Sequence, residues 1–289
     1  MNGLVCQSID DIIKNIINLD TLNSNLKIST MTVTCKFDTL MMVENIGKYI
    51  KLARYGIVTV IPPNGKIRTV VEREVKTNKK DVAKKKSKKA KTINKSFDNQ
   101  ITVIIETPQG RYINVKLFIN GSLHLTGCKH SSEVIYVITI LTKYLTITRY
   151  FYKHEDKKIY PIVFVTDKDN VNTDQIYDFQ IRMINSNFFS EVLIDRSNLC
   201  NMLREIGVTC IYEPCTHACV NIKYEYNKNV ISIFVFESGS IIITGAKKVE
   251  EIDKSFQFII DLLYTHFDKI VKFNMEQYLK NYLKTGKLD

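Results

Sequence analysis

Two distant segments of the chain repeat one another. Residues 114–129 read NVKLFINGSLHLTGCK, and residues 232–247 read SIFVFESGSIIITGAK. Their identical residues lie at a constant separation of 118 positions, which is too long for a solenoid unit and indicates a duplicated half-domain. The matching pairs are Phe118 with Phe236, Gly121 with Gly239, Ser122 with Ser240, Thr126 with Thr244, Gly127 with Gly245, and Lys129 with Lys247.

Each copy predicts the same local structure. An apolar strand leads into a tight turn at Asn120-Gly121 or Ser238-Gly239, and a second strand then ends at a glycine before a helix. Both helices have an apolar stripe that needs a sheet to cover. The stripes are Val134, Val137, Ile138, Leu141 and Leu145 in the first copy, and Ile252, Phe256, Ile259, Ile260, Leu263 and Phe267 in the second; Glu133, Lys143, Glu251, Lys254 and Asp261 are expected on the polar faces.

Composition limits the class of protein. A chain of 289 residues can bury a sizeable core, and no apolar run is long enough to span a membrane. Asp10, Asp11 and Lys14 interrupt the N-terminal stretch, so we expect no secretory signal there. Seven cysteines without regular spacing indicate a reducing compartment.

The positive charge is concentrated in one segment. The formal net charge is +11, and Lys76 to Lys95 holds ten lysines and one aspartate, which leaves only +2 for the rest of the chain. So little apolar content predicts a disordered insert. It is either a solvated loop, a phosphate-attracting arm or an import signal. The basic tract consists of Lys84, Lys85, Lys86, Lys88, Lys89 and Lys91.

The remaining pattern gives both halves one order of elements: strand, helix, several antiparallel strands, helix. Two such copies would join edge to edge, because that pairs their open strand edges. The expected elements of the first half are a short helix capped by Ser8 to Asp11, a strand over 27–38, a helix over 39–52, a hairpin over 55–75, strands over 101–106 and 112–118, and a long helix ending near 150. A connector over 151–177 carries a short strand at 162–165, and the second half has strands over 178–189, 219–226 and 230–236, helices over 197–206 and from 249, and an amphipathic segment over 275–283.

These paired motifs resemble the TATA-box-binding protein family. Phe-Ile-Asn-Gly-Ser … Leu-Thr-Gly-Cys-Lys and Phe-Glu-Ser-Gly-Ser … Ile-Thr-Gly-Ala-Lys match the Phe-x-Ser-Gly-Lys … Thr-Gly-Ala-Lys of both family repeats. The opening strand over 28–38, Asp178-Phe179-Gln180-Ile181 and Tyr212-Glu213-Pro214 add to the resemblance. It covers about residues 26–150 and 178–270, and the divergence and extra segments resemble a homologue from a large or giant DNA virus.

The resemblance implies an α+β fold. We expect a pseudo-twofold saddle in which two repeats share a curved antiparallel sheet, with helices on the convex face. The expected organisation is an N-terminal helical extension over 1–25, a first repeat over 26–150 with a lysine-rich insert at about 55–97, the connector over 151–177, a second repeat over 178–273, and a C-terminal helical tail over 274–289.

The resemblance also implies a set of DNA-contacting residues. Phe118 and Phe236 match one wedge phenylalanine of each repeat; such side chains insert between base steps from the minor groove. Thr126 and Thr244 match groove-facing threonines, and Lys129 and Lys247 match phosphate-contacting lysines. Ile28 on the opening strand and Ile242 on the last strand complete the expected surface.

Other family positions differ in this chain. The second wedge of each pair falls at Ile101 and Cys219 when counted without gaps, with Tyr55 and His217 as rival alignments. The remaining departures put a preference for TATA sequences and strong bending in question without affecting the fold. The family's central asparagines fall at Leu26 and Met183, its lysines after Ser-Gly at Ser122 and Ser240, and one valine at His124, whose counterpart is Ile242.

The sequence favours neither a metal site nor an enzyme. Cys210, Cys215, His217 and Cys219 are residue types that bind zinc, but their spacing is not that of a zinc knuckle, and semi-buried cysteines are the favoured interpretation. Asp167, Asp169 and Asp174 are expected in a solvated loop. We find no nucleophile elbow, phosphate loop or zinc-protease helix, and we expect no cofactor.

The leading hypothesis is a transcription-initiation protein that binds double-stranded, AT-rich promoter DNA and recruits TFIIB-like polymerase initiation factors. We expect a monomer without membrane association, acting in the nucleus or in a cytoplasmic viral factory or virion. One alternative is a protein-interaction scaffold that has lost DNA reading. The other is a nucleic-acid enzyme with a saddle-like accessory domain, but the two repeats leave too few of the given residues for a catalytic domain.

Overall fold

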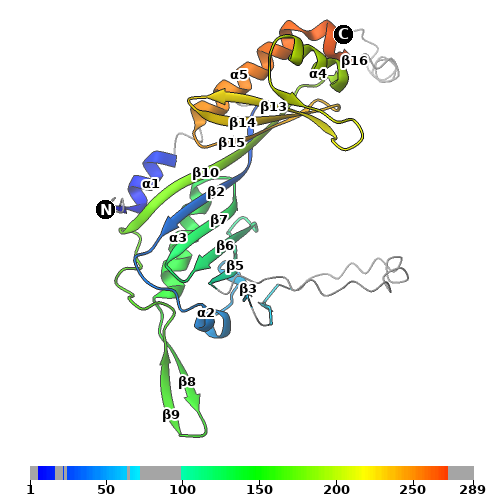
Figure 1. Cartoon of the computed structure of the whole chain (residues 1–289). Coiled ribbons are helices and arrows are strands. Elements are labelled where there is room, and N and C mark those ends of the chain that lie inside the picture. The colour runs from blue at the N-terminus through cyan, green and yellow to red at the C-terminus, as the bar shows by residue number, and fades with distance from the viewer. Residues whose placement is uncertain (1–5, 17–21, 23–24, 64–65, 72–98, 273–289) are drawn as a thin grey trace, which may run out of the picture. The chain divides into compact units, whose positions relative to one another are not determined.

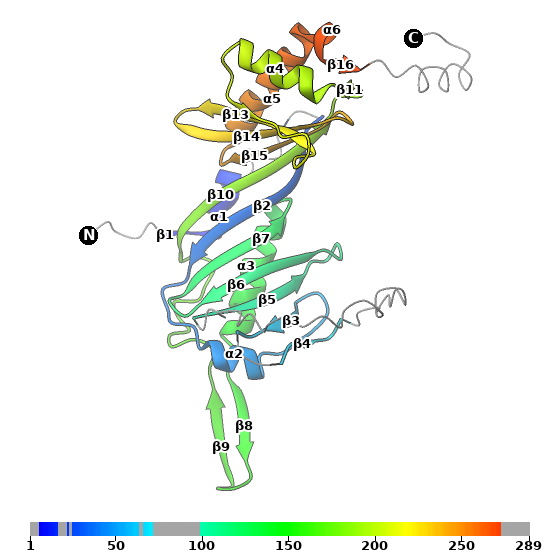
Figure 2. The same ribbon diagram turned by 45° about the vertical axis from the view of Figure 1, so that its right-hand side comes forward.

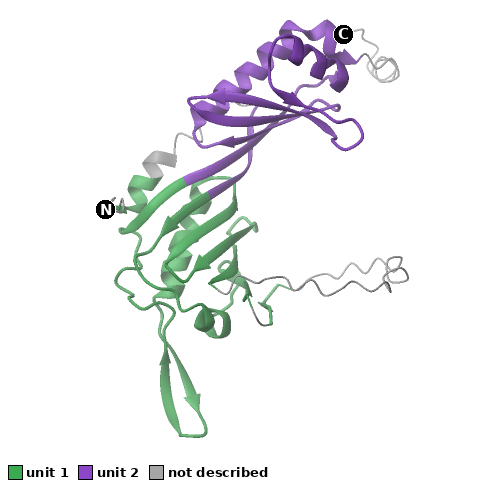
Figure 3. Cartoon of the chain, viewed as in Figure 1, with its two compact units in different colours: residues 1–14, 33–180 green, residues 15–32, 181–289 purple. Residues whose placement is uncertain are grey.

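The computed structural model describes residues 6–16, 22, 25–63, 66–71 and 99–272. The chain divides into two compact units, residues 1–14 with 33–180, and residues 15–32 with 181–289 (Figure 3). Strands β2 and β10 contribute residues to both units. The lysine tract over 84–91 and the expected C-terminal helical tail lie outside the described residues.

Unit 1 is an antiparallel sheet with its helices on one face (Figure 1). Its strand order is β2-β7-β6-β5-β3-β4, and α3 packs on β7 while α2 packs on β5. Figure 2 shows the same strand order from another side. The elements are β1 (Cys6–Gln7), α1 (Ile9–Ile16), β2 (Lys27–Lys36), α2 (Val43–Tyr49), β3 (Ile57–Ile61), β4 (Arg68–Thr69), β5 (Gln100–Glu106), β6 (Tyr112–Phe118), β7 (Ser122–Cys128), α3 (Ser131–Leu145), β8 (Arg149–Lys153) and β9 (Lys158–Ile162).

Unit 2 repeats this plan. Its strand order is β12-β13-β14-β15-β10, and α5 packs on β13, β14 and β15. The elements are β10 (Ile176–Phe189), β11 (Leu193–Ile194), α4 (Arg196–Glu205), β12 (Cys210–Ile211), β13 (Cys219–Tyr226), β14 (Asn229–Phe236), β15 (Ser240–Ala246), α5 (Val249–Thr265), α6 (Phe267–Ile270) and β16 (Val271–Lys272).

The duplicated motif forms the same turn in both units. Gly121 and Gly239 each have a φ of 84°, a left-handed conformation that favours glycine. A Cβ on Gly121 would lie 2.2 Å from the Phe37 carbonyl oxygen, and one on Gly239 would lie 2.4 Å from that of Val192. The glycine is therefore required both by its conformation and by the backbone that crosses it.

Both cores lie between the sheet and its helices. The stripe residues of α3 are fully buried, and Ile252 and Ile259 of α5 are fully buried in unit 2. Ser8 caps α1 as the sequence predicts, because its hydroxyl accepts the Asp11 N–H at 3.2 Å. The connector differs from its expected form: residues 149–162 make the β8–β9 hairpin, while Val165 forms only an isolated bridge with Met41.

Candidate nucleic-acid interface

Strand β14 alternates between the two faces of the unit 2 sheet. Ile231, Ile233 and Val235 are fully buried on the face that α5 covers. Phe234 and Phe236 occupy the intervening positions and are only partly buried. Because successive strand residues point to opposite faces, both rings lie on the face away from α5. We call this face of each unit its open face.

Strand β6 follows the same pattern in unit 1. Ile113, Val115 and Leu117 are fully buried beneath the helices. Phe118 is one residue further along and partly accessible, so it lies on the open face of its own unit. Both repeat phenylalanines therefore lie on the face of their own unit that the helices leave uncovered.

The structure gives the cross-strand neighbours of these rings. Phe236 pairs with Cys219, as expected, and burial raises the pKa of that thiol, so it stays neutral. Phe118 pairs with Gln100, whereas Ile101 pairs with Leu117 and is 1% exposed in the helix-covered core. The assignment of Ile101 to the interface is therefore wrong by one residue. The stretch between Gln100 and Phe118 is one residue longer than the stretch between Cys219 and Phe236. An alignment of the two repeats without gaps misses this extra residue.

The two rival aromatic positions lie elsewhere. Tyr55 precedes β3 in a left-handed conformation with a φ of 54°, and its backbone N–H binds the Glu106 carboxylate. His217 lies in the exposed loop before β13. Neither residue is a cross-strand neighbour of Phe118 or Phe236.

The threonines of the two Thr-Gly motifs also lie on the open faces. Thr126 pairs with Asn114 and donates to its carbonyl oxygen at 3.4 Å. Thr244 pairs with Ser232 and hydrogen-bonds the side chain of Asn185. Ile242 pairs with Phe234, so β15 adds an apolar side chain beside the aromatic pair.

The assignments at the start of the sheet are corrected in part. Ile28 is partly accessible on β2, but Leu26 precedes that strand and is 6% exposed, so it offers no reading surface. Met183 is partly accessible, with its sulfur 3.6 Å from the Thr244 hydroxyl oxygen. The amide on this part of the open face is Asn185.

Backbone hydrogen bonds give the position that matches Asn185 in the first repeat. The Phe37 N–H donates to the Gly121 carbonyl, and the Ser190 N–H donates to the Gly239 carbonyl, so Phe37 and Ser190 are equivalent positions. Counting back along both strands from these two residues makes Thr32 equivalent to Asn185. Counting from the sequence motifs placed the matching pair at Leu26 and Met183 instead, so it missed the register of the two strands by several residues. The first repeat therefore carries a hydroxyl where the second has an amide.

The two lysines after the Thr-Gly motifs lie just before the long helices α3 and α5. Their backbone N–H groups donate to buried carboxylates, from Lys129 to Glu133 at 2.7 Å and from Lys247 to Glu251 at 2.6 Å, while both lysine side chains are accessible. The expectation that Glu133 and Glu251 lie on polar helix faces is wrong. They are 4% and 7% exposed because each caps its own helix from inside.

The same carboxylates join the helices to the sheets. Arg111 donates to Glu133 at 2.8 Å and to the Gly127 carbonyl at 2.7 Å. At the matching position of unit 2, Asn229 donates to Glu251 and to the Gly245 carbonyl, both at 3.1 Å. The duplicated glycine motif is thus held by an equivalent network in each unit.

The two open faces differ in chemistry. Phe234 and Ile242 are cross-strand neighbours in unit 2, and the positions that match them in unit 1 are Lys116 and His124, also neighbours. Sequence reasoning noted His124 but missed Phe234, which is visible as a second phenylalanine two residues before Phe236. At these matching positions unit 2 therefore presents an aromatic and an aliphatic side chain, and unit 1 presents a basic side chain and an imidazole.

The side-chain oxygen of one amide on the unit 2 open face lacks a hydrogen-bond partner in the part of the chain that the structure describes. The Asn221 side-chain oxygen is buried and has no partner among the described residues. Asn221 pairs with Phe234, two residues along β13 from Cys219. A buried polar atom without a partner is uncommon in native structures.

The cysteines do not gather into a site. Cys215 and His217 lie in an exposed loop, and Cys219 lies on β13. Cys210 instead contacts Cys200, with the two sulfur atoms 3.5 Å apart, and burial raises its pKa to about 11. Within the described residues, no three His, Cys, Asp or Glu side chains are placed to hold a metal ion.

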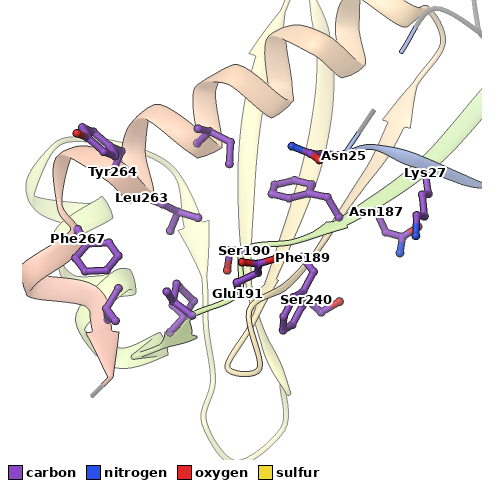
Figure 4. Close-up of a pocket in the computed structure, with 15 residues that line it drawn as sticks. Asn25, Lys27, Asn187, Phe189, Ser190, Glu191, Ser240, Leu263, Tyr264 and Phe267 are labelled. Carbon is purple, nitrogen blue, oxygen red and sulfur yellow. The ribbon is translucent and has the colours of Figure 1, made fainter. Parts of the chain in front are cut away.

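Unit 2 also contains an open pocket of about 820 Å³ (Figure 4). The end of β10 and the residues after it supply Phe189, Ser190 and Glu191, and Leu263, Tyr264 and Phe267 come from the C-terminal end of α5 and from α6. Among the described residues, Glu191 is its one acidic lining residue, and the lining includes no histidine or cysteine.

Comparison with known proteins identifies the family. A "TATA-box-binding protein-like" protein of Acanthamoeba polyphaga mimivirus is 39% identical over 270 residues, which cover 88% of this chain and 69% of that protein. The chain belongs to the TATA-box-binding protein family. The family model "Transcription factor TFIID (or TATA-binding protein, TBP)" matches residues 186–266.

Among solved structures, Methanococcus jannaschii TBP has a TM-score of 0.49 and 15% sequence identity, covering 83% of this chain and 99% of that one. Family membership confirms the expected α+β fold class and makes the chain a TATA-box-binding-protein-like factor, in a family of DNA-binding factors and not of enzymes. The source of the relative agrees with the expected viral homologue. No helix in the described part of the chain is long and apolar enough to cross a membrane.

Proposed function

We propose that the chain binds double-stranded promoter DNA in the minor groove through its open faces and recruits polymerase initiation factors. The observation that carries this proposal is that Phe118 and Phe236 both lie on open faces, away from the helices. A phenylalanine in that position can wedge between base steps, and the wedge would bend the duplex. Thr126 and Thr244 supply polar groups on the same faces.

The difference between the open faces assigns them different roles. Phe234, Phe236 and Ile242 make unit 2 the half that inserts into the groove and contacts sugars. Lys116 and His124 make unit 1 the half that holds phosphates and groove acceptors. Accessible Lys129 and Lys247 are placed at the starts of α3 and α5, where they would meet the phosphate backbone.

A fluorescence-anisotropy titration of AT-rich and GC-rich duplexes tests duplex binding. Phe236→Ala removes a ring that DNA would bury, so affinity should fall roughly 10- to 100-fold. Tyr264→Ala is the matched control, because it removes an exposed aromatic ring from α5 on the other face. Equal affinity of Phe236→Ala and wild type would contradict the assignment of this face.

Base substitution separates the two grooves. An inosine–cytosine pair lacks the guanine amino group, so its minor groove resembles that of A·T while its major groove resembles that of G·C. A minor-groove reader should bind an AT-rich site and its inosine–cytosine replacement similarly, and a G·C replacement more weakly. Discrimination against the inosine site would indicate major-groove reading.

Recruitment of a TFIIB-like factor is proposed for the helix side of unit 2. Tyr264 is 83% exposed and Phe267 is 46% exposed beside the pocket, and exposed aromatic rings are common anchors of protein interfaces. We propose that the protein acts as a monomer, either in the nucleus or in a viral factory or virion. Double substitution of Tyr264 and Phe267 by alanine should weaken co-precipitation of the initiation factor while duplex affinity is retained.

The second candidate is a protein-interaction scaffold without DNA reading. It is favoured by Gln100 and Cys219, because neither cross-strand neighbour of the repeat phenylalanines is aromatic. The anisotropy titration distinguishes the two functions. A scaffold would bind no duplex at low salt once residues 76–95 are deleted.

A further inference from the structure

The β8–β9 hairpin lies outside the repeated plan and forms a separate two-stranded sheet of unit 1 (Figure 2). Its aromatic side chains are accessible: Tyr150 is 72% exposed, and Phe151, Tyr152 and Tyr160 are each more than 40% exposed. Two-stranded hairpins are marginally stable alone, and so many exposed rings on one indicate a binding surface.

Strand register sorts the hairpin into two unlike faces. Phe151 pairs with Tyr160, and Lys153 pairs with Lys158 on the same face. Arg149 also lies on this face, so every charged residue of the two strands is on it, and we call it the cationic face. The opposite, apolar face has only Tyr150, Tyr152, Ile159 and Pro161.

The cationic face is suited to an anion. Lys153 and Lys158 lie directly opposite one another, and like charges in that arrangement destabilise a strand pair. Glu155 and Asp156 in the turn offset Lys153, at 3.2 Å and 4.0 Å, but no carboxylate of the described residues forms a salt bridge with Lys158. Tyr160 also donates to Asp156, which fixes its ring beside the lysines.

We propose that the cationic face of the β8–β9 hairpin binds single-stranded nucleic acid. Bases stack on Phe151 and Tyr160, while Arg149, Lys153 and Lys158 contact the phosphates on either side. Stacking on aromatic rings beside basic side chains is the general mode by which proteins hold single strands with little sequence preference. Phe151 also contacts Tyr49 of α2, with the ring centroids 6.1 Å apart and the ring planes tilted by 49°, which helps to hold the Phe151 ring in place.

The chain contains no tryptophan, so a single introduced one reports on its own site. Tyr160→Trp places the reporter on the cationic face, and Tyr150→Trp places it on the apolar face as the matched control. Titration of the full chain with oligo(dT) should quench the fluorescence of the Tyr160→Trp variant and leave that of the Tyr150→Trp variant unchanged. Adding Phe151→Ala or Lys158→Ser to the Tyr160→Trp variant should weaken oligo(dT) binding roughly 5- to 100-fold.

Other results would overturn the proposal. These are no quenching of the cationic-face reporter, equal quenching of both reporters, equal quenching by a duplex of the same length, and a response of the cationic-face reporter only to vesicles containing anionic lipid. The test is independent of the open faces, because Phe236→Ala can be added to the reporter variant without touching the hairpin. Loss of duplex binding with retained oligo(dT) quenching would therefore separate the two sites.

Discussion

The side chains of Glu133 and Glu251 show why both copies of the repeat need a glutamate at this position. Each carboxylate is buried, caps a long helix and accepts a side-chain donor from the sheet, Arg111 in unit 1 and Asn229 in unit 2. Burial of a charged group is costly unless hydrogen bonds satisfy it. The repeated glutamate therefore positions the helix start, and with it Lys129 or Lys247.

Removing this charge should destabilise the fold. Glu251→Gln keeps the volume but turns the charge-assisted hydrogen bonds that Oε2 accepts from the N–H groups of Lys247 and Lys248 into weaker neutral ones, so the free energy of unfolding should fall by about 1–3 kcal/mol. Urea denaturation measures the loss. Glu205→Gln is the control, because that glutamate is exposed on α4 and should change stability by less than about 0.5 kcal/mol. Equal effects of the two substitutions would contradict the capping role.

A pH dependence is expected from Glu106 in unit 1. Hydrogen bonds from Arg54, at 2.6 and 2.7 Å, and from the Tyr55 N–H hold the pKa of this buried carboxyl below its ordinary value, against the opposing effect of burial. A depressed folded-state pKa gives stability that is present above the unfolded pKa and is lost as pH falls through the folded pKa.

Arg54→Met should therefore destabilise the protein at pH 7, and its difference from wild type should shrink as pH falls from the ordinary glutamate pKa through the lowered folded-state pKa of Glu106. Chemical denaturation across this range measures the difference. Lys48→Met is the control, because Lys48 and its partner Glu44 are both exposed and such pairs add little. A difference that does not change with pH would refute the assignment.

At the scale of elements, the repeated turn should tolerate no side chain. Gly121→Ala strains the backbone and also places a Cβ against the carbonyl oxygens of Phe37 and Thr39. The loss of folding free energy should therefore be roughly twice the 1–3 kcal/mol that is typical of backbone strain alone. Gly110→Ala is the matched control, with a φ of 75° and no atom within 4 Å of the added carbon. Similar losses in thermal denaturation would show that close packing at Gly121 is unimportant.

The sequence predicted elements better than registers. Turn glycines and alternating apolar residues place β6, β7, β14 and β15 correctly, because a period of two residues is visible along the chain. The position of Ile101 depended on the length of the loop between β5 and β6, which no local pattern encodes. A one-residue error moves a side chain to the other face of a sheet, so Gln100 was missed.

Interactions between residues distant in the chain were also beyond sequence reasoning. The burial of Glu133 depends on Arg111, 22 positions away, and the ion pair of Glu106 comes from Arg54, 52 positions away. The β8–β9 hairpin was expected as a connector, because its tyrosines and lysines do not follow a simple alternation of apolar and polar residues. Its two faces are recognisable only from the register that pairs Phe151 with Tyr160.

At the scale of the whole molecule, the contribution of the lysine segment to DNA affinity should be separable from that of the open faces. Deletion of residues 76–95 removes a net charge of +9, yet the open faces remain, so duplex binding should persist. The plot of log affinity against log salt should become shallower, by about 0.9 for each phosphate that the segment had neutralised. Loss of all duplex binding at low salt would show that the lysine segment, and not the sheet, holds the DNA. Replacing the segment with an uncharged spacer of equal length controls for the change in loop length.

The central claim is that Phe118 and Phe236 act as wedges on the open faces, and DNA bending tests it most directly. A duplex labelled with a fluorophore at each end reports the end-to-end distance by energy transfer when saturated with protein. Wild type and Tyr264→Ala should bring the ends closer, whereas the Phe118→Ala/Phe236→Ala double variant should leave the duplex nearly straight even where it still binds. Undiminished bending by the double variant would contradict the account.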